Sequence, residues 1–557
     1  MLLAFAVLFF CGQTGGLAAE APQLPILVSK PPTSAETTRN ALKDLLPTVE
    51  KLRDIGGTAG ISIAVLNHGE VIDEFSLGFS DRDRHLIANP NTLYPLGSLT
   101  KAFVATTISE LVYEGLLDWD KPITAYIPEL HFTADTYLAD RLTLVDLLSH
   151  QIGLERLDGF WLGAENEVLV PKNLTLAAIN QLAPAYPLRT KWQYNNWMYA
   201  LAGEIIERVT YGSWGSALQT RVLDPLQLRQ TTVIESKIPA DSTARPYMVT
   251  DDGEAVQIAD VPLLDGTTMS PAGRVRSSAH DMLIWAKALM AGFRGDPSPL
   301  HRIGDVLSGY AITNRSSGFD ELYALGLAKV TTPTQFGKMG FNPNLVDVMP
   351  LIGEDRPPTS IFYHNGAMPG YNHCLMMVPS QQAAIVVLTN SISQGDVADW
   401  VAQTILQAVI GSTHPLDLVP IADGAAKRWR TRYTTMVETL EKGRTPNTKE
   451  TPHPAIIGAY QHKTQALWIQ VFEEGGVLKF RVNGRDTQTH ILRHYHYDTF
   501  CFLPSAEERI SRALFHYAAP SWLLHFQRKE DTGEVWAIKW KLGNQVTDGE
   551  IFTRVPK

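Results

Sequence analysis

The stretch Leu93-Tyr94-Pro95-Leu96-Gly97-Ser98-Leu99-Thr100-Lys101-Ala102-Phe103-Val104 decides how the rest of the chain is interpreted. Within it, Ser98 and Lys101 have the spacing Ser-x-x-Lys. Apolar side chains then recur at three- and four-residue steps as far as Val112, which predicts a helix that ends at Gly115. Ser98 is therefore expected in the first helical turn, with Lys101 projecting from the same face close to its hydroxyl.

This spacing suits nucleophilic catalysis. A serine hydroxyl is a poor nucleophile until another group takes its proton, and a desolvated, partly deprotonated lysine three residues later can do so. The N-terminus of a helix also favours developing negative charge. The alternative is that Ser98 only caps the helix, because Ser-x-x-Lys is common by chance. The choice between the two depends on the other motifs of the chain.

Composition limits the classes of function. The chain has 557 residues, enough for two or more domains, of which 45% are hydrophobic and 19% charged, as in ordinary globular proteins. A formal net charge of −10 without long basic runs argues against nucleic-acid binding. Cys374 and Cys501 are expected to be free, buried thiols. No Cys/His cluster has zinc spacing, so we expect no metal site, and nucleophilic catalysis by a serine needs no organic cofactor.

The N-terminus is predicted to be a secretion signal over residues 1–21. The short apolar run Met1–Phe10 is followed by small residues and by an A-x-A cleavage site, Ala19-Glu20-Ala21. The alternative is a short membrane anchor, but about ten apolar residues are too few to span a bilayer, so no stable membrane insertion is expected. Two sequons, at Asn173 and Asn314, agree with secretion and are predicted glycosylation sites.

The remaining chain is expected to form an α/β (α+β) catalytic domain over 22–412. Apolar runs at 61–66 and 71–75 around a turn predict a hairpin. Further strands of the same sheet are expected at 361–363, 374–378 and 383–388, with helices between the two ends of the domain.

A second, all-β domain is expected over 455–557. Residues 413–454 are predicted to hold a helix and then a linker, because Pro446, Pro452 and Pro454 stand among polar residues. Beyond them, short strands separated by turn signals predict a small antiparallel barrel or sandwich.

Two more stretches carry groups that can join Ser98. Tyr194 and Asn196 stand at the entrance of a helix predicted from Trp197 to Val209. A phenol has a pKa near 10, and a neighbouring lysine cation would make the Tyr194 phenolate accessible as a proton shuttle. The alternative is that Tyr194 packs while Asn195 or Asn196 caps the helix.

The other stretch is His364-Asn365-Gly366-Ala367, predicted to lie at a strand edge where the glycine lets a substrate approach the backbone. An amide N–H there, with that of Ser98, could form an oxyanion hole. Residues 146–154, in contrast, carry no obvious chemistry and are interpreted as scaffold.

The order Ser98-x-x-Lys101, Tyr194-x-Asn196 and His364-x-Gly366 resembles the signature of the serine β-lactamase and penicillin-binding superfamily. It is most similar to the class C-like branch, with its esterases, D-amino-acid peptidases and acyl transferases. The resemblance covers about residues 40–410 and implies a β-lactamase-like antiparallel sheet flanked by helices, with a helical subdomain. Gly458-Ala-Tyr460 and the stretch 494–500 resemble the lipocalin-like barrel appended to some of these peptidases.

We therefore predict a secreted serine hydrolase that cleaves an ester or amide bond of a small molecule or short peptide through an acyl-enzyme on Ser98. Lys101 and Tyr194 would share the proton transfers, and Asn196 would position the substrate. The N–H groups of Ser98 and Ala367 would hold the oxyanion. The alternatives are an acyl transferase of the same fold, for example in secondary metabolism, and a non-catalytic binding or assembly protein. The sequence leaves the oligomeric state open.

The third motif departs from the family pattern. Many relatives carry Lys-Thr-Gly where this chain has His364-Asn365-Gly366, and the departure argues against β-lactam hydrolysis. His364 would orient Tyr194 or the leaving group. An imidazole of ordinary pKa near 6.5 gains a proton as the pH falls from 7.5 toward 6, so carboxylate-bearing substrates are expected to be accepted better there.

Overall fold

The computed structural model describes residues 34–238, 241–315, 319–542 and 549–556. The expected signal over 1–21 and Ser316 of the second sequon lie outside these residues. No helix among the described residues is long and apolar enough to cross a membrane. In the same part of the chain, no three His, Cys, Asp or Glu side chains gather where they could hold a metal ion. Cys374 and Cys501 are free thiols, the first buried and the second half-buried.

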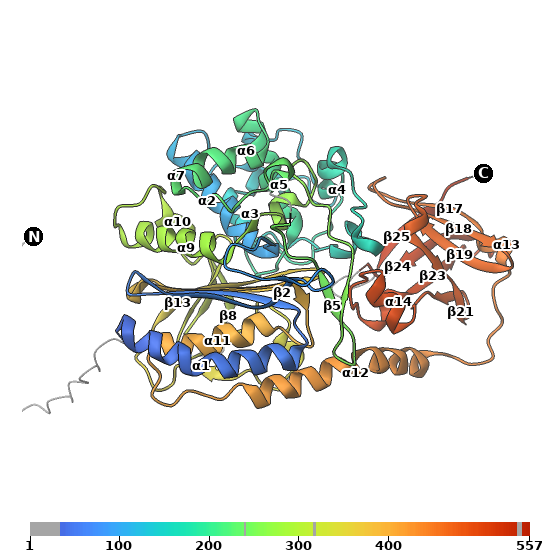
Figure 1. Cartoon of the computed structure of the whole chain (residues 1–557). Coiled ribbons are helices and arrows are strands. Elements are labelled where there is room, and N and C mark those ends of the chain that lie inside the picture. Colours follow the sequence, from blue (N-terminus) through green and yellow to red (C-terminus); the bar gives the residue numbers. More distant parts are fainter. Residues whose placement is uncertain (1–33, 239–240, 316–318, 543–548, 557) are drawn as a thin grey trace, which may run out of the picture. The chain divides into compact units, whose positions relative to one another are not determined.

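A nine-stranded antiparallel sheet lies at the centre of the N-terminal part of the chain (Figure 1). The strand order β3-β2-β1-β15-β14-β13-β10-β9-β8 joins strands from both ends of this part, which confirms the predicted sheet. The hairpin of β1 and β2 turns at His68 and Gly69, whose φ angles of 52° and 76° suit a two-residue turn. The strands are β1 Gly60–Asn67, β2 Glu70–Asp81, β3 Leu86–Ile87, β8 Ala311–Asn314, β9 Glu321–Tyr323, β10 Ala328–Thr331, β13 Ser360–Met368, β14 Tyr371–Val378 and β15 Ala383–Thr389.

Helices cover both faces of this sheet, and the two-residue period of the strands supplies a core to each face. Ile61, Ile63 and Val65 of β1 pack toward α1 Ala35–Gly56 and α11 Val397–Val409. Ala64 and Leu66 pack into the core on the opposite face, with α2 Thr100–Tyr113 and α9 Ala279–Arg294. Figure 1 shows α1, α11 and α12 Val419–Gly443 on one side of the sheet and α2 and α9 on the other.

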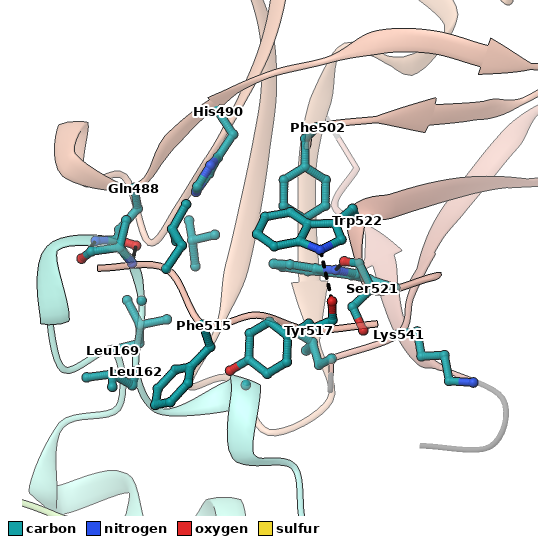
Figure 2. Close-up of a pocket in the computed structure, with 17 residues that line it drawn as sticks. Leu162, Leu169, Gln488, His490, Phe502, Phe515, Tyr517, Ser521, Trp522 and Lys541 are labelled. Atoms are coloured by element: carbon teal, nitrogen blue, oxygen red, sulfur yellow. Dashed lines mark hydrogen bonds between the residues drawn. The ribbon is translucent and has the colours of Figure 1, made fainter. Parts of the chain in front are cut away.

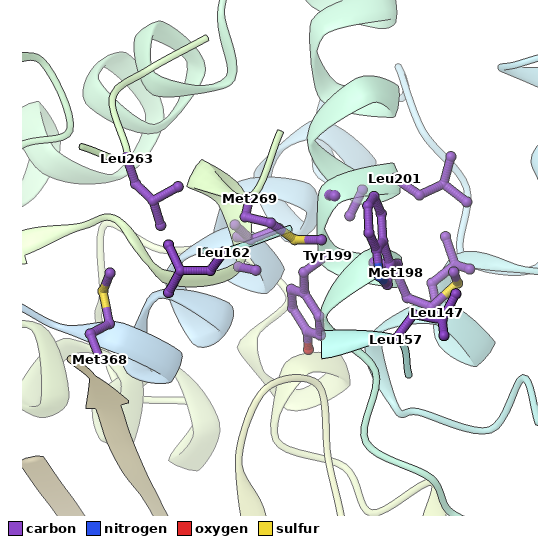
Figure 3. Close-up of a cluster of buried hydrophobic side chains, with 14 of the residues drawn as sticks. Leu147, Leu157, Leu162, Met198, Tyr199, Leu201, Leu263, Met269 and Met368 are labelled. Carbon is purple, nitrogen blue, oxygen red and sulfur yellow. The ribbon is translucent and has the colours of Figure 1, made fainter. Parts of the chain in front are cut away.

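The helical region above α2 is built from short helices around one longer helix, α5 Asn196–Thr210. Part of its core appears in Figure 3, where Met198 and Tyr199 of α5 lie near Leu147 and Leu157. The other helices here are α3 Leu144–Leu148, α4 Thr175–Asn180, α6 Trp214–Leu218, α7 Asp224–Leu226, α8 Ser270–Gly273 and α10 Ile303–Val306. Outside the main sheet lie two strand pairs, β4 Tyr94–Pro95 with β7 Arg276–Ser277 and β11 Thr334–Gln335 with β12 Leu351–Ile352, and a three-stranded sheet of β16 Ser391–Ile392, β5 Tyr247–Val249 and β6 Ala255–Gln257.

The C-terminal part forms a second nine-stranded antiparallel sheet, as the turn spacing predicted. In the order β20-β19-β18-β17-β25-β24-β23-β22-β21, the two end strands are consecutive in the chain, so the sheet curls into a nearly closed barrel. Between α12 and β17 lies only the short helix α13 His453–Ile456, and α14 Ala506–Ser511 follows β22. The strands are β17 Gly458–His462, β18 Trp468–Glu474, β19 Val477–Val482, β20 Thr489–Ile491, β21 Arg493–His496, β22 Thr499–Cys501, β23 Leu523–Arg528, β24 Val535–Trp540 and β25 Glu550–Arg554.

One cluster of buried apolar side chains continues from the helical region into the barrel through Leu162 and Leu169. The two parts therefore share packing as well as the linker between them. The domain boundaries at 412 and 454 stay a prediction.

Candidate active site

Ser98 lies in a 3-10 turn, Gly97–Leu99, that leads directly into α2. Gly97 has a φ of 56°, and a Cβ atom there would approach the backbone nitrogen of Ala367 to 2.7 Å. Only glycine meets both conditions, because an L side chain is strained at this φ and would collide with β13. The missing side chain brings the turn of Ser98 against the backbone of Ala367, as the oxyanion hypothesis requires.

The edge of β13 is free to meet this turn because β10 pairs with β13 only as far as Tyr363. A Cβ atom on Gly366 would lie 2.2 Å from the carbonyl oxygen of Leu96, so this glycine is also needed for the close approach. The strand alternation turns Asn365 to the opposite face, where its amide meets the carboxyl groups of Asp396 and Asp399 near α11.

Two polar groups meet at the serine, one from its own helix and one from a separate stretch. Lys101 donates from Nζ to Ser98 Oγ over 3.2 Å and to the carbonyl oxygen of Ala272 over 2.8 Å. Tyr194 donates from its hydroxyl to the same Oγ over 2.6 Å. Ser98 is half-buried, whereas Lys101 is fully buried because every residue of α2 from Thr100 to Leu111 is buried. The serine is thus reachable while its neighbour is shielded from water.

Burial gives Lys101 the properties of a base. Desolvation lowers its pKa from the ordinary value to about 7, with Arg156 adding to the effect and Asp158 opposing it. Near neutral pH a large fraction of Lys101 is therefore an uncharged amine that can accept a proton.

Tyr194 behaves differently from the sequence-based expectation. Burial raises its pKa above the ordinary value, although the hydrogen bond to Ser98 and the charge of Arg156 oppose the shift. Lys101 Nζ lies 4.9 Å from the ring centroid, but a lysine that is itself often neutral gives little help to a phenolate. The expected accessible phenolate is therefore wrong, and Tyr194 is a neutral hydrogen-bond donor.

The expected protonation of His364 is also wrong. It is buried, and its Nε2 lies 3.0 Å from the hydroxyl of Tyr323, while its Nδ1 lies 2.5 Å from the carbonyl oxygen of Asn365. Burial lowers the pKa of His364 to about 3. The imidazole is neutral from pH 6 to 7.5, so the expected gain for carboxylate substrates in that range does not follow. Its hydrogen bonds go to Tyr323 and Asn365, and its ring centroid is 6.0 Å from that of Tyr194.

Asn196 opens α5, and its neighbour Asn195 caps that helix by accepting a hydrogen bond from the N–H of Trp197. The side-chain amide of Asn196 donates to Asp158 over 2.8 Å. Asp158 in turn is paired with Arg156 at 2.7 Å, and the Arg156 guanidinium lies 5.2 Å from the Tyr194 ring centroid. A fixed ion pair therefore borders the site.

Several of these residues were missed from the sequence. His150 lies in the stretch interpreted as scaffold, yet its ring packs 4.4 Å from that of Tyr194 and its Nδ1 accepts the N–H of Asn195. No sequence pattern identified the other three residues, Arg156, Asp158 and Tyr323. They lie in stretches whose sequence has no helix or strand periodicity.

The two predicted sugar acceptors differ in exposure. Asn173 is exposed, whereas the hydroxyl of Thr175 in the same sequon is buried and bonds to the carbonyl oxygen of Lys172. Asn314 is half-buried at the end of β8.

Comparisons with known proteins add a family and a fold. A model of the family described as Beta-lactamase matches residues 47–408. Among curated proteins, the unguisins hydrolase ungD of Aspergillus violaceofuscus is 26% identical over 347 residues, which are 60% of this chain and 58% of that protein. Protein flp of Staphylococcus aureus strain MW2 is 23% identical over 343 residues, 61% of each chain. The chain thus spans about three-fifths of the length of these relatives.

Among solved structures, the octameric penicillin-binding protein homologue from Pyrococcus abyssi matches with a TM-score of 0.54 and 19% identity, over 92% of this chain and 99% of that chain. The crystal structure of SurE matches with a TM-score of 0.50 and 17% identity, over 94% and 100%. At such identities the likeness is one of fold.

Proposed function

Since the chain belongs to the beta-lactamase family, we propose that it is a serine hydrolase that cleaves an ester or amide through an acyl-enzyme on Ser98. The observation that carries the proposal is the meeting of Lys101 and Tyr194 at one serine oxygen, at 3.2 and 2.6 Å. A buried lysine whose pKa falls to about 7 beside a partly exposed serine is typical of a catalytic base, which favours catalysis over binding alone.

In the first step the uncharged amine of Lys101 takes the proton of Ser98 as Oγ bonds to the substrate carbonyl carbon. The carbonyl oxygen becomes an oxyanion, which the N–H groups of Ser98 and Ala367 stabilise. The leaving group then departs with the proton from the Lys101 ammonium, passed directly or through the Tyr194 hydroxyl. Tyr194 keeps its own proton at rest because burial raises its pKa.

In the second step water gives its proton to Lys101 and attacks the acyl carbon, and the proton returns to Ser98 as the acid leaves. If an alcohol or amine takes the place of water, the same residues carry out acyl transfer. The names of the curated relatives favour hydrolysis. We propose a small-molecule or short-peptide substrate, with Asn196 and the Arg156–Asp158 pair bordering it.

The decisive experiment is labelling with a fluorophosphonate followed by peptide mass spectrometry. The label is expected on Ser98, and Ser98→Ala should lose both the label and ester hydrolysis, by at least about three orders of magnitude. Ser308→Ala, at an exposed serine beyond α10, is the matched control and should keep both. Ester hydrolysis by Ser98→Ala within tenfold of the wild type would refute the acyl-enzyme.

We further propose that the chain is secreted and glycosylated, which the exposed side chain of Asn173 allows. Expression in a eukaryotic host should release a protein that begins at or near Glu20 to Pro22 and loses mass with a glycosidase. An intact N-terminus retained inside the cell would contradict this.

A further inference from the structure

A cavity of about 60 Å³ lies where the barrel meets the segment of residues 159–169 (Figure 2). Its walls are mainly apolar and aromatic, formed by Leu162 and Leu169 from the segment and by Phe502, Phe515, Trp522 and Trp540 from the barrel. One water-sized sphere needs about 10–15 Å³, so this volume accepts roughly four or five carbon-sized groups.

Apart from Lys541 at its rim, the lining carries no charged side chain. Burial lowers the pKa of His490, one of the wall residues, to about 3, so its imidazole is neutral. In Figure 2 the amine of Lys541 is turned away from the aromatic side chains. Ser521 is buried in the wall, and its hydroxyl has no hydrogen-bond partner within the described residues. Such a surface fits an uncharged group and disfavours a charged one.

The cavity adjoins the catalytic residues through a single short piece of chain. Gly159, in its wall, follows Asp158, which holds the amide of Asn196 at 2.8 Å. A Cβ atom on Gly159 would lie 3.5 Å from the hydroxyl of Tyr517, so the barrel reaches this piece directly. The opposite end of the Asp158 ion pair, Arg156, faces the ring of Tyr194. Residues 156–159 therefore run from the ring of Tyr194 to the wall of the cavity.

The barrel holds this segment in place with polar contacts. The side-chain amide of Gln488 pairs with both the N–H and the carbonyl oxygen of Ala164, each at 2.9 Å. Arg485 binds Glu167 at 2.8 Å, and Asn483 donates to the carbonyl oxygen of Leu169 at 3.1 Å. Because these contacts order the wall before any ligand arrives, the cavity is preformed, and little entropy is lost on filling it.

We propose that this cavity is a substrate subsite that accepts an uncharged aliphatic group, the size of a leucine side chain or the end of a medium-length acyl chain. The group belongs to the substrate of Ser98, so the inference rests on the proposed function. The barrel then takes part in substrate selection by supplying most of the aromatic wall.

The test compares kcat/KM for p-nitrophenyl esters from acetyl to octanoyl, below their micelle concentrations. Burial of one methylene is worth about fourfold in rate. Once the acyl chain reaches the cavity, kcat/KM should therefore rise about fourfold for each of roughly four successive carbons. A chain of equal length that ends in a carboxylate should lose the gain. Short p-nitroanilides with leucine, glycine or lysine beside the scissile residue show whether a side chain fills the cavity instead.

Ser521→Met fills the cavity without breaking a hydrogen bond, because the hydroxyl has none in the described structure. It should abolish the long-chain or leucine preference and leave the acetyl ester unchanged, while Ser521→Ala keeps the preference. Gly159→Leu fills the cavity from the opposite wall, where the nearest heavy atom to a new Cβ atom is 3.4 Å away. An identical chain-length profile in the wild type and both folded filling variants would overturn the proposal.

A binding measurement separates this proposal from the proposed function. Octanamide is titrated into Ser98→Ala while the tryptophan fluorescence of the protein is followed, to which Trp522 and Trp540 of the cavity wall contribute, and this requires no turnover. A saturable change that disappears in Ser98→Ala/Ser521→Met supports the subsite even if ester hydrolysis proves independent of Ser98. If the fluorescence of Ser98→Ala does not change on titration, the subsite is refuted. The proposed acyl-enzyme on Ser98 is not affected by that result.

Discussion

The state of the Lys101 amine should set the pH dependence of the serine's reactivity. With a pKa of about 7, half of the molecules carry an uncharged amine at pH 7. A lysine of ordinary pKa ~10.4 would be uncharged in only about one molecule in 2,500 at that pH. Burial therefore raises the population of the base by about a thousandfold. The rate constant for modification of Ser98 should therefore rise tenfold per pH unit below pH 7 and level off above that pH.

The assay is the second-order rate constant for fluorophosphonate labelling of Ser98 between pH 5.5 and 9, which does not require the natural substrate. Lys101→Arg keeps a cation that cannot act as a base and should slow labelling at pH 8 by about a thousandfold or more. Lys427→Arg, at an exposed lysine of α12, is the matched control and should match the wild type.

The Arg156–Asp158 ion pair makes it possible to test the direction in which each charge shifts the pKa of Lys101. Asp158 raises the pKa of Lys101 and Arg156 lowers it. Asp158→Asn should therefore move the midpoint of the profile to lower pH, and Arg156→Gln should move it to higher pH. A labelling rate that is flat across the range, or Lys101→Arg within tenfold of the wild type, would refute the assignment of Lys101 as the base.

Two further predictions concern stability and domain contact. Burial raises the pKa values of Asp396 and Asp399, and the charge of Asp399 raises that of Asp396 further, so the folded state keeps a proton that the unfolded chain releases above about pH 4. The free energy of unfolding should fall as pH rises toward neutral, by at most ~1.4 kcal/mol per pH unit and proton. Thermal melts from pH 5 to 8 should show a shallower fall in Asp396→Asn, and equal slopes would count against it. Limited proteolysis should cut within the exposed stretch 444–450, which has no helix or strand. The fragments should co-elute on gel filtration because Gln488 and Arg485 bind the segment 164–167, and their separation would contradict that contact.

The elements that sequence reasoning predicted well are those whose signal is local. The hairpin of β1 and β2 follows from two apolar runs around His68-Gly69, and α2 follows from Ser98-x-x-Lys101 and an apolar run that ends at Gly115. Each depends on residues within about one helix or hairpin of one another, so periodicity and turn chemistry suffice. The proximity of Lys101 to Ser98 is likewise local, whereas the contact of Tyr194 with Ser98, 96 residues away, was predicted from the resemblance to the β-lactamase superfamily.

The parts that were not predicted depend on partners far away in the chain. Residues 155–169 have little periodicity, because side chains such as Gln488, more than 300 residues later, hold them. The neutrality of His364 was equally hidden, since its pKa depends on burial that no local pattern reveals. Desolvation outweighs the charge of Asp158 at Lys101 and the hydrogen bond to Asn365 at His364, and it has opposite consequences for the two groups. Desolvation lowers both pKa values: it leaves Lys101 able to accept a proton near neutral pH and keeps the His364 imidazole neutral.

This dependence on burial links the barrel to the chemistry. In the proposed mechanism Lys101 acts as a base only while water is kept from its amine, and the Arg156–Asp158 pair that adjusts its pKa lies directly before the segment 159–169 that the barrel holds. Charged side chains at the edge of a buried site shift a pKa according to where they are fixed, so a mobile Arg156 would have a weaker and more screened effect. The contacts of Gln488 with Ala164 and of Arg485 with Glu167 thus fix the position of a charge pair whose other face meets Tyr194 and Asn196. A barrel far along the chain from Ser98 contributes in this way to the protonation of the group beside it.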